Sequence, residues 1–325
     1  MNEQATSAEL DILGIGCATL DTVGTVDEFP RDDGKTRVFD LEEHGGGPAA
    51  TAMVACRRLG LRAGLIAKVG DDEAGKKIRT GLAEEGVDVS RLVAAPGERS
   101  MVSFCFANRR TGQRIVYYYR SQRRSLEIEQ IDRRWLTTVP ILLVDGVELP
   151  AAGRAADIVR GAGGLTVMDA GTAHPSYADA LPHIDYLVAS WKFARDYTEK
   201  ETPEAAIETL RWSGFHRAVV VTLGDQGYIA AEGGRPAFRG DAFRVKALDT
   251  TGAGDTFHGA FCVGLRRDWP LEQVCVFASA CAALKCARLG GRAGIPTRNQ
   301  AIAFLKQHAR RYNWPAPNQS LECGL

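Results

Sequence analysis

Short apolar runs alternate with helix-like segments along most of this chain, and that alternation limits its possible folds more than any other feature. The runs cover residues 10–16, 63–69, 141–144, 165–168, 186–189 and 218–222. Runs that are apolar at nearly every position are typical of strands buried on both faces of a parallel sheet. We therefore predict an α/β fold with a doubly wound, mostly parallel sheet flanked by helices.

Polar residues stand at or after the ends of several predicted strands. Asp21 comes just past the first strand, and Asp145, Asp169 and Ser190 follow later ones. Because right-handed crossovers keep the carboxyl ends of parallel strands on one side, these residues are expected along one edge of the sheet. The sequence thus predicts a ligand site in a crevice at that edge.

Three segments instead alternate between apolar and polar residues, at 35–41, 101–107 and 114–119. This pattern predicts a small sheet with one wet face, able to cover a cleft as a lid and to pair with another subunit. We expect one domain at 10–313, with lid strands inserted at about 35–43 and 99–121. Residues 314–325 are expected to form a loose tail.

Composition excludes several classes of function. The 325 residues include 40 basic and 40 acidic side chains, so there is no electrostatic case for a nucleic-acid partner. No apolar run approaches the roughly 20 residues that span a bilayer, and the first nine residues lack a signal core, so a cytoplasmic location is expected. The eight cysteines and six histidines are scattered and indicate no metal cluster.

The stretch 249–260 reads Asp-Thr-Thr-Gly-Ala-Gly-Asp-Thr-Phe-His-Gly-Ala and runs from a turn into a predicted helix. Gly252 and Gly254 permit crowded backbone at the helix start, where free amides and the helix dipole attract an anion. Asp255 would repel that anion as a ligand, so we interpret it as a base that takes a proton from a hydroxyl. The alternative is a carboxylate that only stabilises the helix N-terminus.

Two further glycine groups lie in the N-terminal half. Gly14 and Gly16 suggest a dinucleotide-binding turn, but Thr19 stands where glycine or alanine is required and no amphipathic helix follows. Asp21 is better suited to accept hydrogen bonds from sugar hydroxyls. Residues 45–47 are three glycines before a predicted helix, which permits close approach of backbone to a ligand.

The 249–260 stretch resembles the C-terminal signature of the ribokinase-like (PfkB) carbohydrate kinases, and the glycines at 45–47 fall where that family has its first signature. The resemblance extends from about residue 11 to 304. Within the family, 46–52 and 283–296 look most like the sulfofructose kinases, and 114–121 looks more like the ketohexokinases.

This resemblance implies an ATP-dependent kinase that transfers the γ-phosphate to a hydroxyl of a small sugar, a ketohexose or a sulfofructose-like ketose, with Mg²⁺ accompanying ATP. Asp255 would be the base, and the amides of Gly252, Ala253 and Gly254 the anion hole. The sugar would meet Asp21, Gly46, Gly47 and Asp145. The nucleotide would meet Thr222, Gly224, Gly227, Arg120 and Ser190. By analogy, a homodimer would form through the lid sheet.

Two departures from the family pattern affect the pocket. Ala50 stands where many members have an asparagine that contacts the sugar, and Ser190-Trp191-Lys192-Phe193 replaces an N-x-x-E motif linked to magnesium and phosphate. Metal ligands are therefore left unassigned. Two alternatives stay open: a nucleoside kinase of the same family, or a non-catalytic protein on this fold that binds a sugar or nucleotide.

Overall fold

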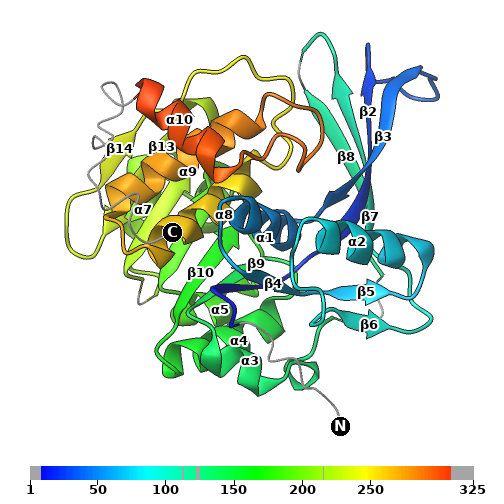
Figure 1. Cartoon of the computed structure of the whole chain (residues 1–325). Helices are drawn as coiled ribbons and strands as arrows, with labels where there is room; N and C mark the ends of the chain where they lie inside the picture. The colour runs from blue at the N-terminus through cyan, green and yellow to red at the C-terminus, as the bar shows by residue number, and fades with distance from the viewer. Residues whose placement is uncertain (1–8, 112, 122–124, 215, 309–325) are drawn as a thin grey trace.

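A computed structural model describes residues 9–111, 113–121, 125–214 and 216–308 of the chain. A large sheet lies between two layers of helices, and a second, smaller sheet projects beside it (Figure 1). The large sheet has eight strands in the order β14-β13-β12-β11-β10-β9-β1-β4. This arrangement confirms the predicted α/β fold with a mostly parallel sheet.

Six strands of the large sheet run parallel, and two antiparallel strands complete one side. The parallel strands are β1 (Ile12–Ile15), β4 (Ala63–Ile66), β9 (Ile141–Asp145), β10 (Leu165–Ala170), β11 (Tyr186–Ser190) and β12 (Ala218–Thr222); the others are β13 (Tyr228–Glu232) and β14 (Phe238–Gly240). In chain order, β4 is the first strand to pair with β1, and β9 later pairs with the other edge of β1. The strand order therefore reverses between β1 and β9, where open α/β sheets form their ligand crevice.

Helices cover both faces of this sheet. One layer contains α1 (Pro48–Arg58), α2 (Glu73–Glu84), α8 (Ala253–Arg266), α9 (Leu271–Lys285) and α10 (Arg298–His308); the other contains α3 (Arg133–Thr138), α4 (Leu149–Gly161), α5 (Tyr177–Ala180), α6 (Trp191–Thr198) and α7 (Pro203–Leu210). Successive strand residues alternate between the two cores: Leu143 packs with the first layer and Leu142 with the second. Burial on both faces explains why these strands are continuously apolar.

The smaller sheet, which we call the lid, has the order β3-β2-β7-β8. Its strands are β2 (Thr19–Val26), β3 (Val38–Gly46), β7 (Val102–Asn108) and β8 (Arg114–Tyr119). The sequence interpretation missed β2: Asp21, predicted just past the end of the first strand, lies inside this second strand. Aspartate and glycine are poor strand formers, but pairing with β3 on one side and β7 on the other outweighs that local preference.

A two-stranded sheet of β5 (Lys68–Gly70) and β6 (Val93–Ala95) connects the lid region to the main domain. The predicted strand 63–69 is thus two short strands in different sheets. The predicted tail 314–325 and the predicted domain end at 313 lie outside the described residues. Within the described ranges, no helix is both long and apolar enough to cross a membrane.

Candidate active site

The polar ends of the parallel strands meet at one edge of the sheet, as the sequence predicts. Asp145 on β9 is the direct neighbour of Asp169 on β10, and Ser190 on β11 is the direct neighbour of Thr222 on β12. Asp145 and Asp169 share a face with the residues that pack against α8. The start of α8 therefore lies over a row of carboxylates.

Gly252 forms the N-cap of α8 in a left-handed conformation, with φ of 78°. A Cβ added there would lie 2.3 Å from the carbonyl oxygen of Gly291, so only glycine fits without displacing backbone. The Ala253 amide donates to Thr250 O at 3.2 Å and is thus already engaged. The first turn of any helix has amides without intrahelical acceptors, and the helix dipole adds positive potential there. This turn can therefore hold an anion.

Asp255 lies in that first turn and is partly exposed. Burial of its carboxylate raises its pKa to about 7, and the negative charges of Asp169 and Asp145 act in the same direction, while His258 and Arg114 oppose them. A carboxyl group that titrates near neutral pH is suited to accept a proton from an alcohol.

His258 lies one turn further along α8 and is buried. Its Nδ1 is 2.6 Å from Gly254 O and 3.4 Å from Asp169 Oδ2, while its Nε2 is 3.2 Å from Val188 O. Burial lowers the pKa of His258, and burial next to Asp145 raises the pKa of Asp169 to about 8. His258 thus ties the first turn of α8 to β10 and β11 beneath it.

Asp21 and the glycine pair lie together, as predicted for a sugar site. Asp21 Oδ1 accepts hydrogen bonds from Thr19 Oγ1 at 2.6 Å and Ser103 Oγ at 2.7 Å. A Cβ on Gly46 would lie 1.8 Å from Asp21 Oδ2, so the missing side chain makes room for this carboxylate. Gly47 has φ of 91° and forms the N-cap of α1, where a Cβ would lie 2.4 Å from Cys17 O.

The carboxylate of Asp145 has three backbone donors. Oδ2 accepts from the amides of Cys17 at 2.8 Å and Ala49 at 3.1 Å, and Oδ1 accepts from Val147 at 2.9 Å. Burial raises the pKa of Asp145 to about 6, although these hydrogen bonds oppose the rise. In this structure Asp145 joins the end of β9 to the turn after β1 and the start of α1, and contact with a sugar stays a prediction.

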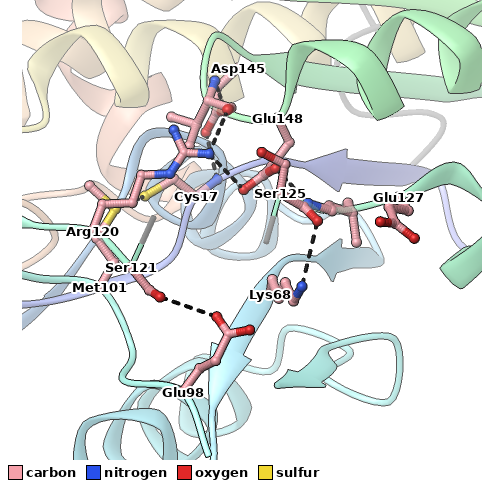
Figure 2. A network of polar contacts seen from close by, with 12 residues as sticks. Cys17, Lys68, Glu98, Met101, Arg120, Ser121, Ser125, Glu127, Asp145 and Glu148 are labelled. Atoms are coloured by element: carbon pink, nitrogen blue, oxygen red, sulfur yellow. Dashed lines mark hydrogen bonds and ion pairs between the residues drawn. The ribbon is translucent and has the colours of Figure 1, made fainter. Parts of the chain in front are cut away.

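An open pocket lies beside this junction, with an empty volume of about 460 Å³ that includes the solvent at its mouth. Its lining includes three cationic side chains, Lys68, Arg99 and Arg120, and two carboxylates, Glu98 and Glu148. Figure 2 shows Arg120 reaching towards Glu148, at 3.2 Å, and Ser121 towards Glu98, also at 3.2 Å. Arg120 also donates to Val147 O at 3.0 Å. Arg120 therefore lies in the pocket near the β9 end.

Four of the five residues predicted for the nucleotide, Ser190, Thr222, Gly224 and Gly227, lie along the β11–β12 part of the edge, whereas the fifth, Arg120, lies near the end of β9. Gly224 and Gly227 have left-handed φ values of 64° and 88° in the turn that joins β12 to β13. Ser190 caps α6: its Oγ accepts from the Phe193 amide at 3.0 Å and donates to Gly171 O at 2.9 Å. The hydroxyl of Ser190 is thus engaged in local structure here, and its contact with a nucleotide stays a prediction.

Sequence reasoning missed three basic residues around the turn before α8. Arg114, at the start of β8, donates from Nη1 to Thr251 Oγ1 at 3.2 Å. Arg292 is buried behind the glycine pair and donates to Gly46 O at 2.7 Å. Lys285, at the end of α9, is fully buried and donates to Asp249 O at 2.9 Å. Each comes from a segment far away in sequence, so no local pattern indicates these contacts.

A doubly wound sheet, with carboxylates at one edge and a glycine turn that starts a helix above them, is an arrangement suited to a phosphotransferase that acts on a hydroxyl compound. Residues 10–298 match the sequence profile described as pfkB family carbohydrate kinase. The chain belongs to this family and is an ATP-dependent carbohydrate kinase.

Curated and solved relatives agree with this assignment. The chain is 29% identical over 285 residues to a ribokinase of Haemophilus influenzae, covering 81% of this chain and 88% of that protein. It is 30% identical over 290 residues to fructokinase-1 of Oryza sativa, covering 80% and 88%. The structure matches a ribokinase of Thermotoga maritima with a TM-score of 0.79 and 26% identity, covering 91% of this chain and 99% of that one. These relatives differ in the sugar that they are named for.

Kinases of this family use ATP with Mg²⁺. In the described part of the chain, no group of three or more His, Cys, Asp or Glu side chains is arranged to hold a metal ion. Mg²⁺ at phosphoryl-transfer sites commonly binds phosphate oxygens, water and only one or two carboxylates. Asp169 at the end of β10 and Asp255 in the first turn of α8 are the carboxylates that would be available for such a limited contact. The ion would neutralise phosphate charge during transfer.

Proposed function

We propose that this kinase phosphorylates a hydroxyl of a small ketose, with Asp255 as the base. The observation that carries the proposal is the position of Asp255, a carboxylate with a pKa raised to about 7, in the first turn of a helix whose start can bind an anion. A base and an anion site in one helical turn are what an attacking hydroxyl and a transferred phosphoryl group require.

In the proposed reaction, the Asp255 carboxylate takes the proton of the sugar hydroxyl. The hydroxyl oxygen forms a bond to the γ-phosphorus of ATP, and the bond from that phosphorus to the β,γ-bridging oxygen breaks, so ADP leaves. The amides at Gly252 and Gly254 stabilise negative charge on the transferred group. Arg114, held against Thr251, adds positive charge at the same turn.

Asp21, Gly46 and Gly47 would hold the sugar hydroxyls on the lid side of the site. Asp21 Oδ1 has two hydroxyl donors from Thr19 and Ser103, and Oδ2 faces Gly46. The nucleotide would lie along Thr222, Gly224, Gly227 and Ser190. Ala50 is a fully buried alanine and offers a sugar no polar group, unlike an asparagine.

The acceptor is proposed to be a ketohexose or a sulfofructose-like ketose. The three cationic side chains of the pocket, Lys68, Arg99 and Arg120, outnumber its two carboxylates, Glu98 and Glu148. This excess of positive charge supports an acceptor with a negatively charged substituent, because guanidinium groups bind such oxyanions through paired hydrogen bonds. We accordingly assign Arg120 to the substrate rather than to the phosphates of ATP. Arg114 lies at the phosphoryl end instead.

A panel of acceptors tests this assignment. Fructose, sulfofructose, ribose, tagatose phosphate and nucleosides are each incubated with MgATP, and ADP release is measured. We expect the highest kcat/KM for a ketose with a charged substituent. Preference for a nucleoside would establish the nucleoside-kinase alternative, and calorimetric sugar binding without ADP release from any compound would establish a non-catalytic binding protein.

We also propose a homodimer formed through the lid. Phe104 on β7 is directly opposite Tyr117 on β8, so the two side chains share a face, with exposed fractions of 44% and 61%. Tyr119, two residues along, is exposed on the same face. Ser103 and Tyr118 belong to the opposite face, which carries Asp21. A second copy of this exposed aromatic face would bury both surfaces. The cytoplasmic location stays a prediction.

A further inference from the structure

Lys285, the last residue of α9, has no exposed surface although it carries an ammonium group. Its Nζ donates to the backbone oxygen of Asp249 at 2.9 Å and lies 4.0 Å from Asp249 Oδ2. Lysine is among the residues that are least often fully buried, because removing its charge from water is unfavourable unless the charge is paired. A buried lysine at this position therefore calls for a specific explanation.

Lys285 binds Asp249, and every polar group of Asp249 has a hydrogen-bond partner. Its carboxylate accepts from the amides of Thr251 at 2.8 Å and Gly290 at 2.8 Å, and its own amide donates to Cys286 O at 3.2 Å. Lys285 completes the set by binding the backbone oxygen. Asp249 thus joins the turn before α8 to the loop at Gly290.

This junction fixes where the anion-binding amides point. The turn crosses the 290–291 loop so closely that a Cβ on Gly252 would meet Gly291 O at 2.3 Å. The Asp249 carboxylate binds both segments that cross, because it accepts hydrogen bonds from the amide of Thr251 in the turn and from the amide of Gly290 in the loop. Without the ammonium, the backbone oxygen of Asp249 would lose a hydrogen bond and its buried carboxylate would lose the nearby positive charge. Both losses favour rearrangement of the turn.

We propose that Lys285 is a positioning residue for phosphoryl transfer: its buried ammonium acts as a built-in cation that holds Asp249, and through Asp249 the turn that carries the amides of Gly252 and Gly254. Lys285 has this role only if those amides stabilise the transferred phosphoryl group, as proposed above. The ammonium does not touch the reacting atoms. Its contribution is to keep the donors fixed before charge develops on the phosphate.

Lys285→Met tests this role, because methionine matches the length of the aliphatic stem and removes the charge. We expect kcat to fall between about 10-fold and 10²-fold, with the KM for the sugar unchanged within about twofold, since only transition-state stabilisation is lost. Amide hydrogen exchange at 250–254 should accelerate. Lys306→Met, which removes an exposed lysine from α10, is the matched control and should change neither quantity.

Chemical rescue separates a positioned charge from general packing. In Lys285→Ala, added ammonium or methylammonium should enter the space left by the side chain and restore part of kcat, whereas Asp255→Asn should show no rescue. A variant that merely destabilised the fold would not regain activity with a small cation.

The possible results distinguish the positioning role of Lys285 from the proposed function of the amides at the start of α8. Accelerated exchange at 250–254 with a lower kcat and cation rescue supports the role of Lys285. Unchanged exchange in Lys285→Met, or lost kcat in Lys285→Ala without any rescue, overturns it. Accelerated exchange with an unchanged kcat overturns the proposed function of the Gly252 and Gly254 amides, and with it the positioning role.

Discussion

His258 and Asp169 form a buried contact directly beneath the start of α8, with His258 Nδ1 3.4 Å from Asp169 Oδ2. The same ring nitrogen lies 2.6 Å from Gly254 O, so this contact connects the central sheet to the turn that carries Asp255. Charge on Asp169 is therefore felt by the proposed base.

Asp169→Asn should shift the pH dependence of turnover. Because the pKa values of Asp169 and Asp255 are raised to about 8 and about 7, Asp169 carries only part of a negative charge where Asp255 ionises. Replacing Asp169 with a neutral amide removes that partial repulsion, so the acid limb of kcat should move to lower pH by a fraction of a pH unit. The measurement is kcat against pH for the two proteins. A shift to higher pH would contradict the proposed electrostatic role of Asp169.

The wild-type protein should itself lose activity on the acid side of neutrality. Because burial raises the pKa of Asp255 to about 7, the carboxylate form that accepts a proton becomes populated only as pH rises through that value. Turnover at saturating substrate should rise by about tenfold per pH unit below pH 7 and level off above it. A flat profile between about pH 5 and 8 would count against Asp255 as base.

The free energy of unfolding should fall as pH rises, whereas turnover rises. The folded-state pKa of Asp255 is above the ordinary value of 3.8, so the unfolded chain loses this proton first as pH rises. The free energy of unfolding should therefore decrease from about pH 4 to pH 7 through this group, and Asp145 and Asp169 add to the trend. Urea unfolding of wild type and Asp255→Asn should show a weaker decrease in the variant.

Arg120→Met should discriminate between charged and neutral acceptors. Arg120 lines the pocket at the β9 end, and a charge-assisted hydrogen bond contributes about 1.5–3 kcal/mol. We expect KM to rise by about 10-fold to 10²-fold for a ketose with an anionic substituent and to change little for fructose. Arg134→Met, on the exposed surface of α3, is the control. An equal rise for both acceptors would contradict the assignment of Arg120 to the anionic group.

Tyr117→Lys should separate the proposed dimer into monomers. The substitution puts a charge in the middle of the outward aromatic face of the lid, where a second copy would bury it. Light scattering at micromolar concentration should give half the mass of the wild type. Trp212→Lys changes a similarly exposed aromatic residue outside the lid and should leave the mass unchanged. A monomeric wild type would contradict the dimer directly.

The sequence predicted the parts of the fold that depend on local pattern. Continuous apolar runs identified the parallel strands, and the polar residues at their ends identified the edge where Asp145, Asp169 and Ser190 lie. Strand β2 was missed because its stability comes from two neighbouring strands rather than from its own residues.

The candidate site was predictable only where one short stretch carries it. Gly252 and Asp255 stand in a single turn, so their relation is visible in the sequence. Lys285 and Arg114 reach that turn from distant parts of the chain: the contact of Lys285 with Asp249 joins residues 36 positions apart, and that of Arg114 with Thr251 joins residues 137 positions apart. Arg292 reaches the glycine pair instead, at Gly46, which is 246 positions away. Such contacts depend on how the helices and the lid pack, which no local pattern encodes.

The role of Asp255 as the base is tested by the turnover of Asp255→Asn with the preferred ketose and MgATP. Asparagine keeps the size of the side chain but cannot accept the proton, so kcat should fall at least about 10²-fold, while ATP binding by calorimetry stays close to wild type. Near-wild-type turnover in this variant would contradict the assignment of Asp255 as the catalytic base.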